Sequence, residues 1–189
     1  MKNKIIGIII LVVLVGVGKE VYDVNINYNF KEITKGKVFK SGVIPPNEIA
    51  SYIKKYKIKS IIDLRRPGTN DTVNNPEVPS QLLAEKLAVE KIEGVNYYNV
   101  ISSQVPEQKT LDSFFNIMDD TNNYPVLIHC HHGEGRAPLF GALYRIEYED
   151  MSNDEARKRT RTLVKWSPFD KNNYKGEFLM NYKKRESNK

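Results

Sequence analysis

The sequence has one cysteine, one tryptophan and three histidines, and this scarcity already excludes several classes of protein. A single cysteine cannot form a disulfide within the chain, so the fold depends on its core. The formal net charge of +6 suits an anionic partner but is too modest to indicate nucleic acid. Internal repeats and low-complexity segments are also lacking. The basic end, NYKKRESNK, is expected to be a solvated tail.

The longest apolar run lies near the N-terminus, from Ile5 to Gly18, behind Lys2 and Lys4. As a helix it would cover about 21 Å, which is less than the roughly 30 Å hydrocarbon core of a membrane. A basic front followed by a short apolar stretch is typical of a secretory signal, and cleavage after Gly18 would fit its small residues. The alternative is an uncleaved anchor that attaches residues 5–18 to the inner membrane. Both interpretations predict export to the periplasm or another compartment outside the cytoplasm.

From Lys37 onward, strand-like and helix-like segments alternate. Short β-branched or aromatic runs predict strands at Lys37–Gly42, Ile58–Leu64, Gly94–Val100 and Pro125–His129. Apolar periodicity and composition predict helices at Ile49–Tyr56, Gln81–Ile92, Leu111–Met118 and Ala137–Glu149. This alternation predicts an α/β fold, with a mostly parallel central sheet of about four to five strands and helices on both faces. The expected organisation is a signal peptide or anchor at 1–18, a linker at 19–36 and a catalytic domain at 37–189.

The stretch VLIHCHHGEGRAP, from Val126 to Pro138, contains the only cysteine and every histidine of the chain. Such crowding suggests either a metal site or a nucleophilic cysteine beside an anion cradle. A metal site is disfavoured because neighbouring side chains of an extended segment point to opposite faces, so four consecutive residues, His129 to His132, cannot converge on one ion. It would also leave the two glycines and Arg136 unexplained. We therefore expect neither a metal nor another cofactor.

An anion cradle accounts for the rest of this stretch. A loop between a strand and a helix turns successive N–H groups inward, and the helix N-terminus adds partial positive charge. Gly133 and Gly135 allow the tight backbone turns, and Arg136 offers a planar pair of donors that matches phosphate oxygens. Positive surroundings of this kind favour the thiolate form of a cysteine, here Cys130. The competing interpretation is that Cys130 is simply a small buried apolar residue.

The segment HCHHGEGR matches the His-Cys-five-residues-Arg signature and resembles the cysteine-dependent protein tyrosine phosphatases. With AP following, it is similar to the dual-specificity branch, and KSGVIPPNEIASYIKKYKIKSIIDLRRP resembles the front of compact bacterial members. The resemblance implies a phosphorylated protein or a small phosphate ester as substrate. It also implies Cys130 as the nucleophile, His129 as a residue that holds the loop, and a phosphate-binding set made of His131, His132, Gly133, Glu134, Gly135 and Arg136.

Two departures from the family pattern stand out. The family usually has Ser or Thr after the arginine, where this chain has Ala137, and it usually takes its general acid from the loop after the third strand. Here that loop, ISSQVP, contains no carboxylate, so Asp71, Glu107 and Glu134 are the substitutes that we consider. These departures leave two alternatives to an active phosphatase: a catalytically impaired phosphate- or phosphoprotein-binding module, and a rhodanese-like sulfurtransferase.

The arginines after the second predicted strand have two possible roles. Arg65 and Arg66 lie at the carboxyl end of that strand, where ligands of parallel sheets bind, and are placed to steer phosphate inward. Alternatively, Arg65 pairs with Asp63, two residues earlier.

Overall fold

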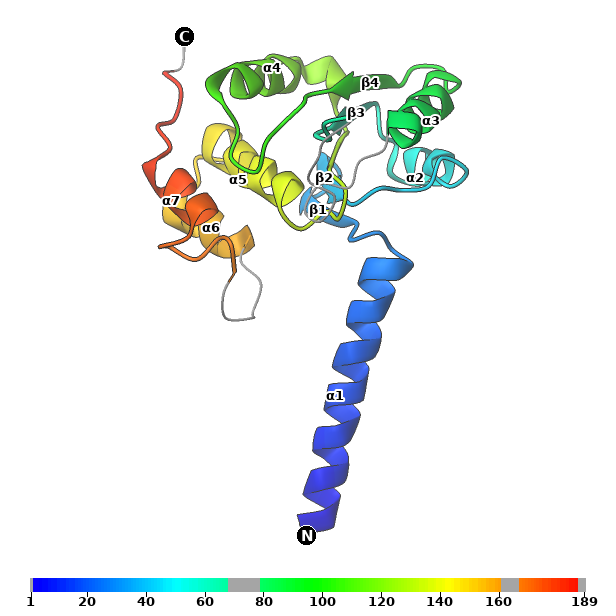
Figure 1. Cartoon of the computed structure of the whole chain (residues 1–189), viewed down its shortest axis with the longest axis vertical. Coiled ribbons are helices and arrows are strands. Elements are labelled where there is room, and N and C mark those ends of the chain that lie inside the picture. The colour runs from blue at the N-terminus through cyan, green and yellow to red at the C-terminus, as the bar shows by residue number, and fades with distance from the viewer. Residues whose placement is uncertain (1, 68–78, 161–166, 187–189) are drawn as a thin grey trace.

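The computed structural model describes residues 2–67, 79–160 and 167–186 of the chain. It begins with a long helix, α1 (Lys2–Asn25), which stands away from the rest of the molecule (Figure 1). Large apolar side chains along α1 are exposed: Ile6, Leu11, Val13, Leu14, Val15 and Val17. Among the described residues, no helix combines the length and the hydropathy that crossing a membrane requires.

The remaining chain folds around a five-stranded sheet in the order β1-β2-β5-β3-β4. Its strands are β1 (Lys31–Thr34), β2 (Val38–Ser41), β3 (Ser60–Asp63), β4 (Asn96–Asn99) and β5 (Val126–His129). Strand β1 is antiparallel to β2, and every other neighbouring pair is parallel, so the predicted mostly parallel α/β fold is confirmed. Ser41 and Asp63 both lie opposite His129, which brings the carboxyl ends of β2, β3 and β5 level at one edge of the sheet.

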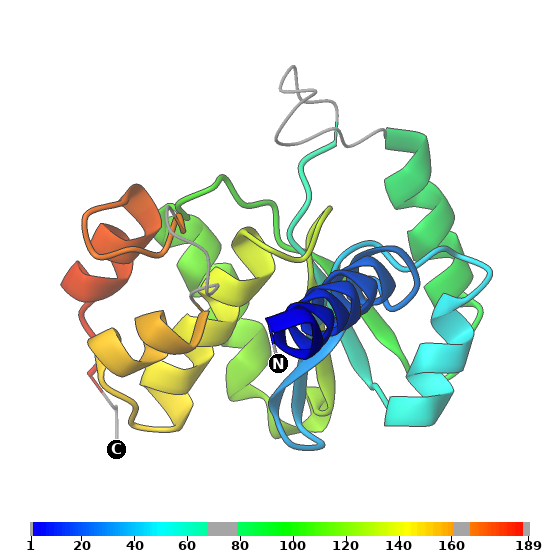
Figure 2. The same cartoon turned by 90° about the horizontal axis from the view of Figure 1, so that it is seen from below.

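Helices cover both faces of the sheet (Figures 1 and 2). On one face lie α2 (Ile49–Tyr56) and α3 (Pro79–Glu90); on the other lie α4 (Gln108–Asp119), α5 (Arg136–Tyr148), α6 (Asn153–Thr160) and α7 (Tyr174–Asn181). A short 3-10 turn, η1 (Thr121–Asn123), leads into β5. In β5, Leu127 packs into the core under α2 and α3, whereas Val126 and Ile128 pack on the opposite side. This two-sided burial is why β5 is apolar almost throughout.

The linker expected over residues 19–36 is instead largely part of ordered elements. Its first residues continue α1 to Asn25, and its last residues form β1 at the edge of the sheet. Phe30, between them, is buried in the core under α2. An edge strand has only one hydrogen-bonded neighbour and needs less apolar sequence than a central strand, so the polar segment KEIT gave no strand signal. The folded unit therefore begins before residue 37.

The basic C-terminal segment is also more than the solvated tail expected from its composition. The guanidinium of Arg185 donates two hydrogen bonds of 2.9 Å to the carboxylate of Asp119, at the end of α4. It donates a further one of 3.1 Å to Glu147 of α5 and stacks 4.2 Å from the ring centre of Phe115. These contacts fasten the chain end that follows α7 to the two helices beneath it.

Candidate active site

The loop between β5 and α5 lies at the level edge of the sheet, and its carbonyl groups are tied outward. The carbonyl oxygen of His131 accepts a hydrogen bond from the N–H of Val43, at 2.9 Å. The next carbonyl, of His132, accepts one from the side-chain amide of Asn29, and that of Gly133 accepts one from the Lys40 ammonium, both at 2.8 Å. Because the C=O and the following N–H of a trans peptide point in opposite directions, these ties turn the N–H groups of residues 132–134 to the inner side of the loop.

The inner side of the loop offers free donors. Within the described residues, nothing accepts a hydrogen bond from the N–H groups of residues 131–135. The loop geometry depends on Gly133, which has a φ of +74°. A Cβ on Gly133 would lie 2.7 Å from the carbonyl oxygen of Ser41 and closer still to other backbone atoms of β2 and Gly42. Gly133 is therefore required both for its conformation and for its close approach to β2.

Cys130 and Arg136 begin and end this loop. Cys130 directly follows β5 and is 3% exposed, at the end of the core between the sheet and α5. Arg136 is the first residue of α5, and its Nη1 donates to the carbonyl oxygens of Leu64, at 3.0 Å, and Ser102, at 3.5 Å. Since these two residues follow β3 and β4, the guanidinium is fixed where the ends of three strands meet. The structure thus brings together the loop after β3, the loop after β4 and the cysteine loop, as predicted.

Two buried lysines add positive charge around Cys130. Burial, together with the charge of Lys31, lowers the pKa of Lys40 to about 8, against the opposing influence of Cys130 and Glu134. Burial likewise lowers the pKa of Lys175 of α7 to about 8, while the charge of Cys130 acts in the opposite direction. The site therefore combines a sulfur, a guanidinium and two ammonium groups in a region with little access to water. Such an arrangement favours anions.

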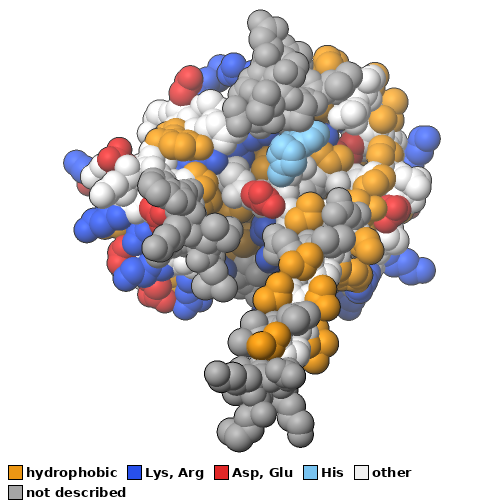
Figure 3. Space-filling view, turned by 60° about the horizontal axis from the view of Figure 1, so that its bottom comes forward, with side chains coloured by type: hydrophobic (Ala, Val, Ile, Leu, Met, Phe, Trp, Pro, Cys, Tyr) orange, Lys and Arg blue, Asp and Glu red, His pale blue; other side chains and the backbone are white. Residues whose placement is uncertain are grey.

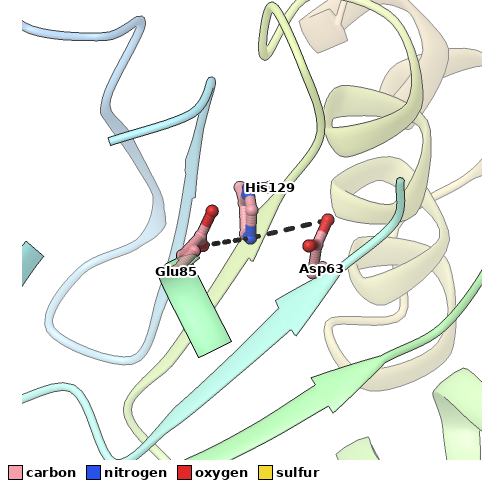
Figure 4. A group of neighbouring side chains, drawn as sticks. All are labelled: Asp63, Glu85 and His129. Carbon is pink, nitrogen blue, oxygen red and sulfur yellow. Dashed lines mark ion pairs between the residues drawn. The ribbon is translucent and has the colours of Figure 1, made fainter. Parts of the chain in front are cut away.

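Behind the loop, buried charges form a network around His129 (Figure 4). The imidazole Nε2 lies 2.9 Å from a carboxylate oxygen of Glu85, on α3, and 3.7 Å from one of Asp63. Burial alone would lower the pKa of His129, but the charges of Glu85 and Asp63 outweigh it and raise that pKa. Glu85 thus reaches from a helix on one face of the sheet to the residue preceding Cys130.

Arg65 belongs to this same network. It is fully buried and donates to Asp63, at 2.8 to 3.1 Å, and to Glu85, at 2.5 Å. Asp63, Glu85 and His129 also present ligand-type atoms within 4.8 Å of one another, but the Arg65 guanidinium already compensates both carboxylates. Of the two roles considered for Arg65, the pairing with Asp63 is therefore observed, and Arg65 is not placed to steer phosphate; Arg66 is exposed.

The remaining loop side chains lie toward solvent. Figure 3 shows histidine side chains exposed near the middle of this face, with an acidic side chain beside them. His132 and Glu134 are exposed, and a Glu134 carboxylate oxygen accepts a hydrogen bond of 3.3 Å from Asn29. His131 is half-buried, and burial together with the charges of His132, Arg65 and Arg136 lowers its pKa.

A cavity of about 490 Å³ opens beside His131. Its mostly apolar lining comes from the segment before α2 and from the first turns of α3: Val43, Pro46, Ser80, Gln81, Ala84 and Glu85. The cavity lies next to the cysteine loop and provides space beside it for a substrate larger than phosphate.

The three carboxylates considered as general acids have different positions. Asp71 lies outside the described residues. Glu107 precedes α4 on the exposed surface, and no described group donates a hydrogen bond to its carboxylate. Glu134 lies on the exposed side of the loop. Ala137 is fully buried in the first turn of α5 and brings no hydroxyl to the site.

Several residues around the loop were missed by sequence reasoning. Asn29, Lys40, Glu85 and Lys175 all contact the loop or the charges beside it. For Lys40 a signal existed, because it follows Val38 by two positions and so shares the buried face of a predicted central strand. Lys175 lies in a polar segment with ordinary spacing, and nothing in the sequence marks it.

His129 also departs from its predicted role of holding the loop through hydrogen bonds. Among the described residues, neither ring nitrogen of His129 has a hydrogen-bond partner in the loop. Its side chain pairs with Glu85 and Asp63, so the loop is held instead by Val43, Asn29 and Lys40.

Comparison with solved structures shows the same fold in two phosphatases. The core catalytic domain of the PP-IP phosphatase Siw14 of S. cerevisiae matches with 21% identity and a TM-score of 0.60, over 84% of this chain and 87% of that one. TpbA of P. aeruginosa matches with 14% identity and a TM-score of 0.57, over 83% and 86%. Comparison with curated protein sequences gives no match.

At the level of sequence families, the match covers most of the chain. The family described as "DSP-PTPase phosphatase fused to NAD+ Kinase" matches residues 19–177, which include every strand of the sheet, the cysteine loop and the first residues of α7. The chain therefore belongs to this family and is a cysteine-dependent phosphatase of the protein tyrosine and dual-specificity type.

Proposed function

We propose that this chain hydrolyses phosphate monoesters with Cys130 as the nucleophile and Arg136 as the clamp on the phosphoryl oxygens. In the first step the Cys130 sulfur attacks phosphorus, and the bond from phosphorus to the leaving oxygen breaks. In the second step water attacks phosphorus, the phosphorus–sulfur bond breaks, and inorganic phosphate and the thiolate are released. The N–H groups of residues 132–134 and the guanidinium stabilise the charge on the equatorial oxygens in both steps.

The outward ties of three consecutive carbonyl groups carry this proposal. They give the loop after Cys130 an inner side made of donors, which is the requirement for holding a tetrahedral dianion. The buried cations of Lys40, Arg136 and Lys175 support it, because burying positive charge beside a sulfur is unfavourable unless anions compensate it.

Three variants of the full chain test the proposed roles with para-nitrophenyl phosphate. We expect Cys130→Ser to abolish turnover and Arg136→Lys to lower kcat/KM by about 10² or more, because lysine cannot bind two oxygens at once. Arg159→Lys is the matched control, since Arg159 is exposed on α6. Acid quenching should trap a phosphoenzyme in the wild-type chain and none in Cys130→Ser. Full activity of Cys130→Ser would refute the proposal.

One observation favours a second function, a phosphate-binding module with impaired turnover. Ala137 occupies the position where a hydroxyl would assist breakdown of the phosphocysteine. If breakdown is very slow, the enzyme releases one equivalent of nitrophenol in a burst and then stops. Ala137→Ser should then speed the steady-state rate without changing the burst. A sulfurtransferase would instead turn over thiosulfate, a reaction for which family membership gives no support.

The substrate class is approached with a panel suggested by the structural relatives. One relative is named a PP-IP phosphatase, and another was crystallised in complex with pTyr. We infer that the present chain acts on phosphotyrosine or has dual specificity, because the apolar cavity beside His131 suits an aryl group or peptide side chain. Phosphotyrosine peptides should then give a higher kcat/KM than inositol pyrophosphates. The reverse order would refute this substrate class and leave the cysteine mechanism intact.

We further propose that residues 1–18 direct the domain out of the cytoplasm. Support comes from the basic front before Ile5, the apolar run to Gly18 and the position of α1 away from the sheet domain (Figure 1). Fractionation of cells that produce a C-terminally tagged chain tests this, with a chain lacking residues 2–18 as the control. A processed protein outside the cytoplasm would support a cleaved signal, whereas an unprocessed protein pelleting with membranes would support an anchor. An unprocessed full chain in the cytoplasmic fraction would refute export.

A further inference from the structure

Lys175 is a buried cation at the rim of the cysteine loop, although it lies 39 residues beyond Arg136 in the sequence. It belongs to the first turn of α7 and is 2% exposed. Its ammonium donates a hydrogen bond of 2.7 Å to the side-chain carbonyl of Gln104, in the loop after β4. The rings of Tyr174 and Phe169 lie 5.4 and 5.6 Å from its nitrogen and exclude water from that side.

The ammonium of Lys175 lies directly over Gly135. A Cβ placed on Gly135 would be 2.6 Å from the Lys175 nitrogen and 3.3 Å from the Gln104 oxygen. The absence of a side chain at Gly135 therefore makes room for the ammonium. As a result, Lys175 bridges the two loops between which a leaving group must depart, the one that follows β4 and the one that holds Cys130.

No described carboxylate lies within ion-pair distance of the Lys175 ammonium. The charged groups that face it are Cys130, after β5, and Arg136, on α5. A buried ammonium with only an amide oxygen as partner is costly for the folded state, so its retention suggests a function. Burial lowers the pKa of Lys175 to about 8, which allows it to give up a proton near neutral pH.

We infer that Lys175 is the proton donor to the leaving group, the role for which the loop after β4 provides no carboxylate. This inference rests on the proposed phosphatase function. As the Cys130 sulfur bonds to phosphorus and the phosphorus–oxygen bond breaks, a proton moves from the Lys175 ammonium to the departing oxygen. In the second step the neutral amine accepts a proton from the attacking water, which restores the ammonium and releases phosphate with the thiolate.

A series of leaving groups tests the inference. The substrates are dinitrophenyl, para-nitrophenyl and phenyl phosphate, whose leaving groups need protonation increasingly. Lys175→Met should lower kcat/KM for phenyl phosphate by roughly 10²–10³-fold, and for dinitrophenyl phosphate by less than about tenfold. Lys175→Arg keeps the charge but not a transferable proton, so it should show the same dependence on the leaving group. Lys171→Met, on the exposed turn before α7, is the matched control and should behave as the wild type.

Different outcomes separate this inference from its premise. Equal losses across the three substrates, or recovery of activity in Lys175→Arg, would show that Lys175 acts only through its charge and would overturn the inference. Activity in Cys130→Ser would instead overturn the proposed function itself. The wild-type chain gives a readout independent of the folding of any variant. Its kcat/KM for phenyl phosphate should fall above about pH 8, and that for dinitrophenyl phosphate should not; parallel profiles would also overturn the inference.

Discussion

Nε2 of His129 and a carboxylate oxygen of Glu85 lie 2.9 Å apart, and each residue is about 99% buried. This ion pair connects α3 to the end of β5, immediately before the proposed nucleophile. It is surrounded by Arg65 and Asp63, so that two cationic and two anionic groups share one dry space (Figure 4). The position of Cys130 thus depends on a helix that contributes nothing to the anion cradle itself.

Removing one charge from this network should destabilise the protein strongly. We expect Glu85→Gln to lower the free energy of unfolding by about 3–5 kcal/mol, because Arg65 and His129 then share a single carboxylate without water. Glu90→Gln, on the same helix, removes only a half-exposed ion pair with Lys86 and should cost less than about 0.5 kcal/mol. Urea unfolding of both variants measures the difference. Equal effects would show that the buried pair is not structurally important.

Two histidines of the same segment should differ in charge at one pH. The carboxylates beside His129 raise its pKa, whereas burial and neighbouring positive charges lower that of His131. Nitrogen NMR at about pH 6.5 should therefore find His129 doubly protonated and His131 neutral. Because the pKa of His129 is raised in the folded state, its contribution to stability is complete below about pH 6.5 and is lost as the pH rises through the folded value. Neutral His129 at pH 6.5 would contradict this assignment.

Two glycines with positive φ provide a matched pair of substitutions. Gly133→Ala should lower kcat/KM by at least about 10²-fold, because its Cβ would displace β2 or the loop and so misplace the donors. Gly36 has a φ of +62° and open space around it, so Gly36→Ala should cost about 1 kcal/mol of stability with kcat/KM unchanged. Steady-state kinetics and thermal unfolding of both variants distinguish the two effects. Wild-type kinetics in Gly133→Ala would disprove the role of the loop geometry.

Lys175→Met should make the protein more stable while it lowers activity. Replacing a buried cation that has no carboxylate partner by an apolar residue of similar length should raise the free energy of unfolding at pH 7 by about 1–3 kcal/mol. Since the pKa of Lys175 falls to about 8 on folding, the wild type gains stability as the pH rises from 8 toward the unfolded value near 10.5. The difference between the two proteins should therefore shrink over that range. A less stable Lys175→Met at pH 7 would contradict the expected cost of burial.

The architecture and the cysteine loop were predictable because they depend on local patterns. Central strands such as β5 are buried on both sides and so have continuous apolar sequences, while the loop is marked by glycine spacing within eight residues. Strand β1 was missed because an edge strand imposes little on its sequence.

The surroundings of the loop were not predictable for a different reason. Glu85 and Lys175 come from helices that are distant in the sequence, and their burial is decided by tertiary packing. A lysine or glutamate on a helix is usually solvated, so neither residue gives a signal. Sequence reasoning therefore identified the cradle and missed the charges that support it.

The clasp made by Arg185 has a consequence for truncated forms of the chain. Because it fastens the segment after α7 to Asp119 and Glu147, it also restrains the helix that carries Lys175. A chain shortened before Arg185 would keep its sulfur and its oxyanion pocket but hold its acid loosely. Such a fragment would still cleave activated aryl esters, and a survey with the usual chromogenic reagent alone would mistake it for the intact enzyme.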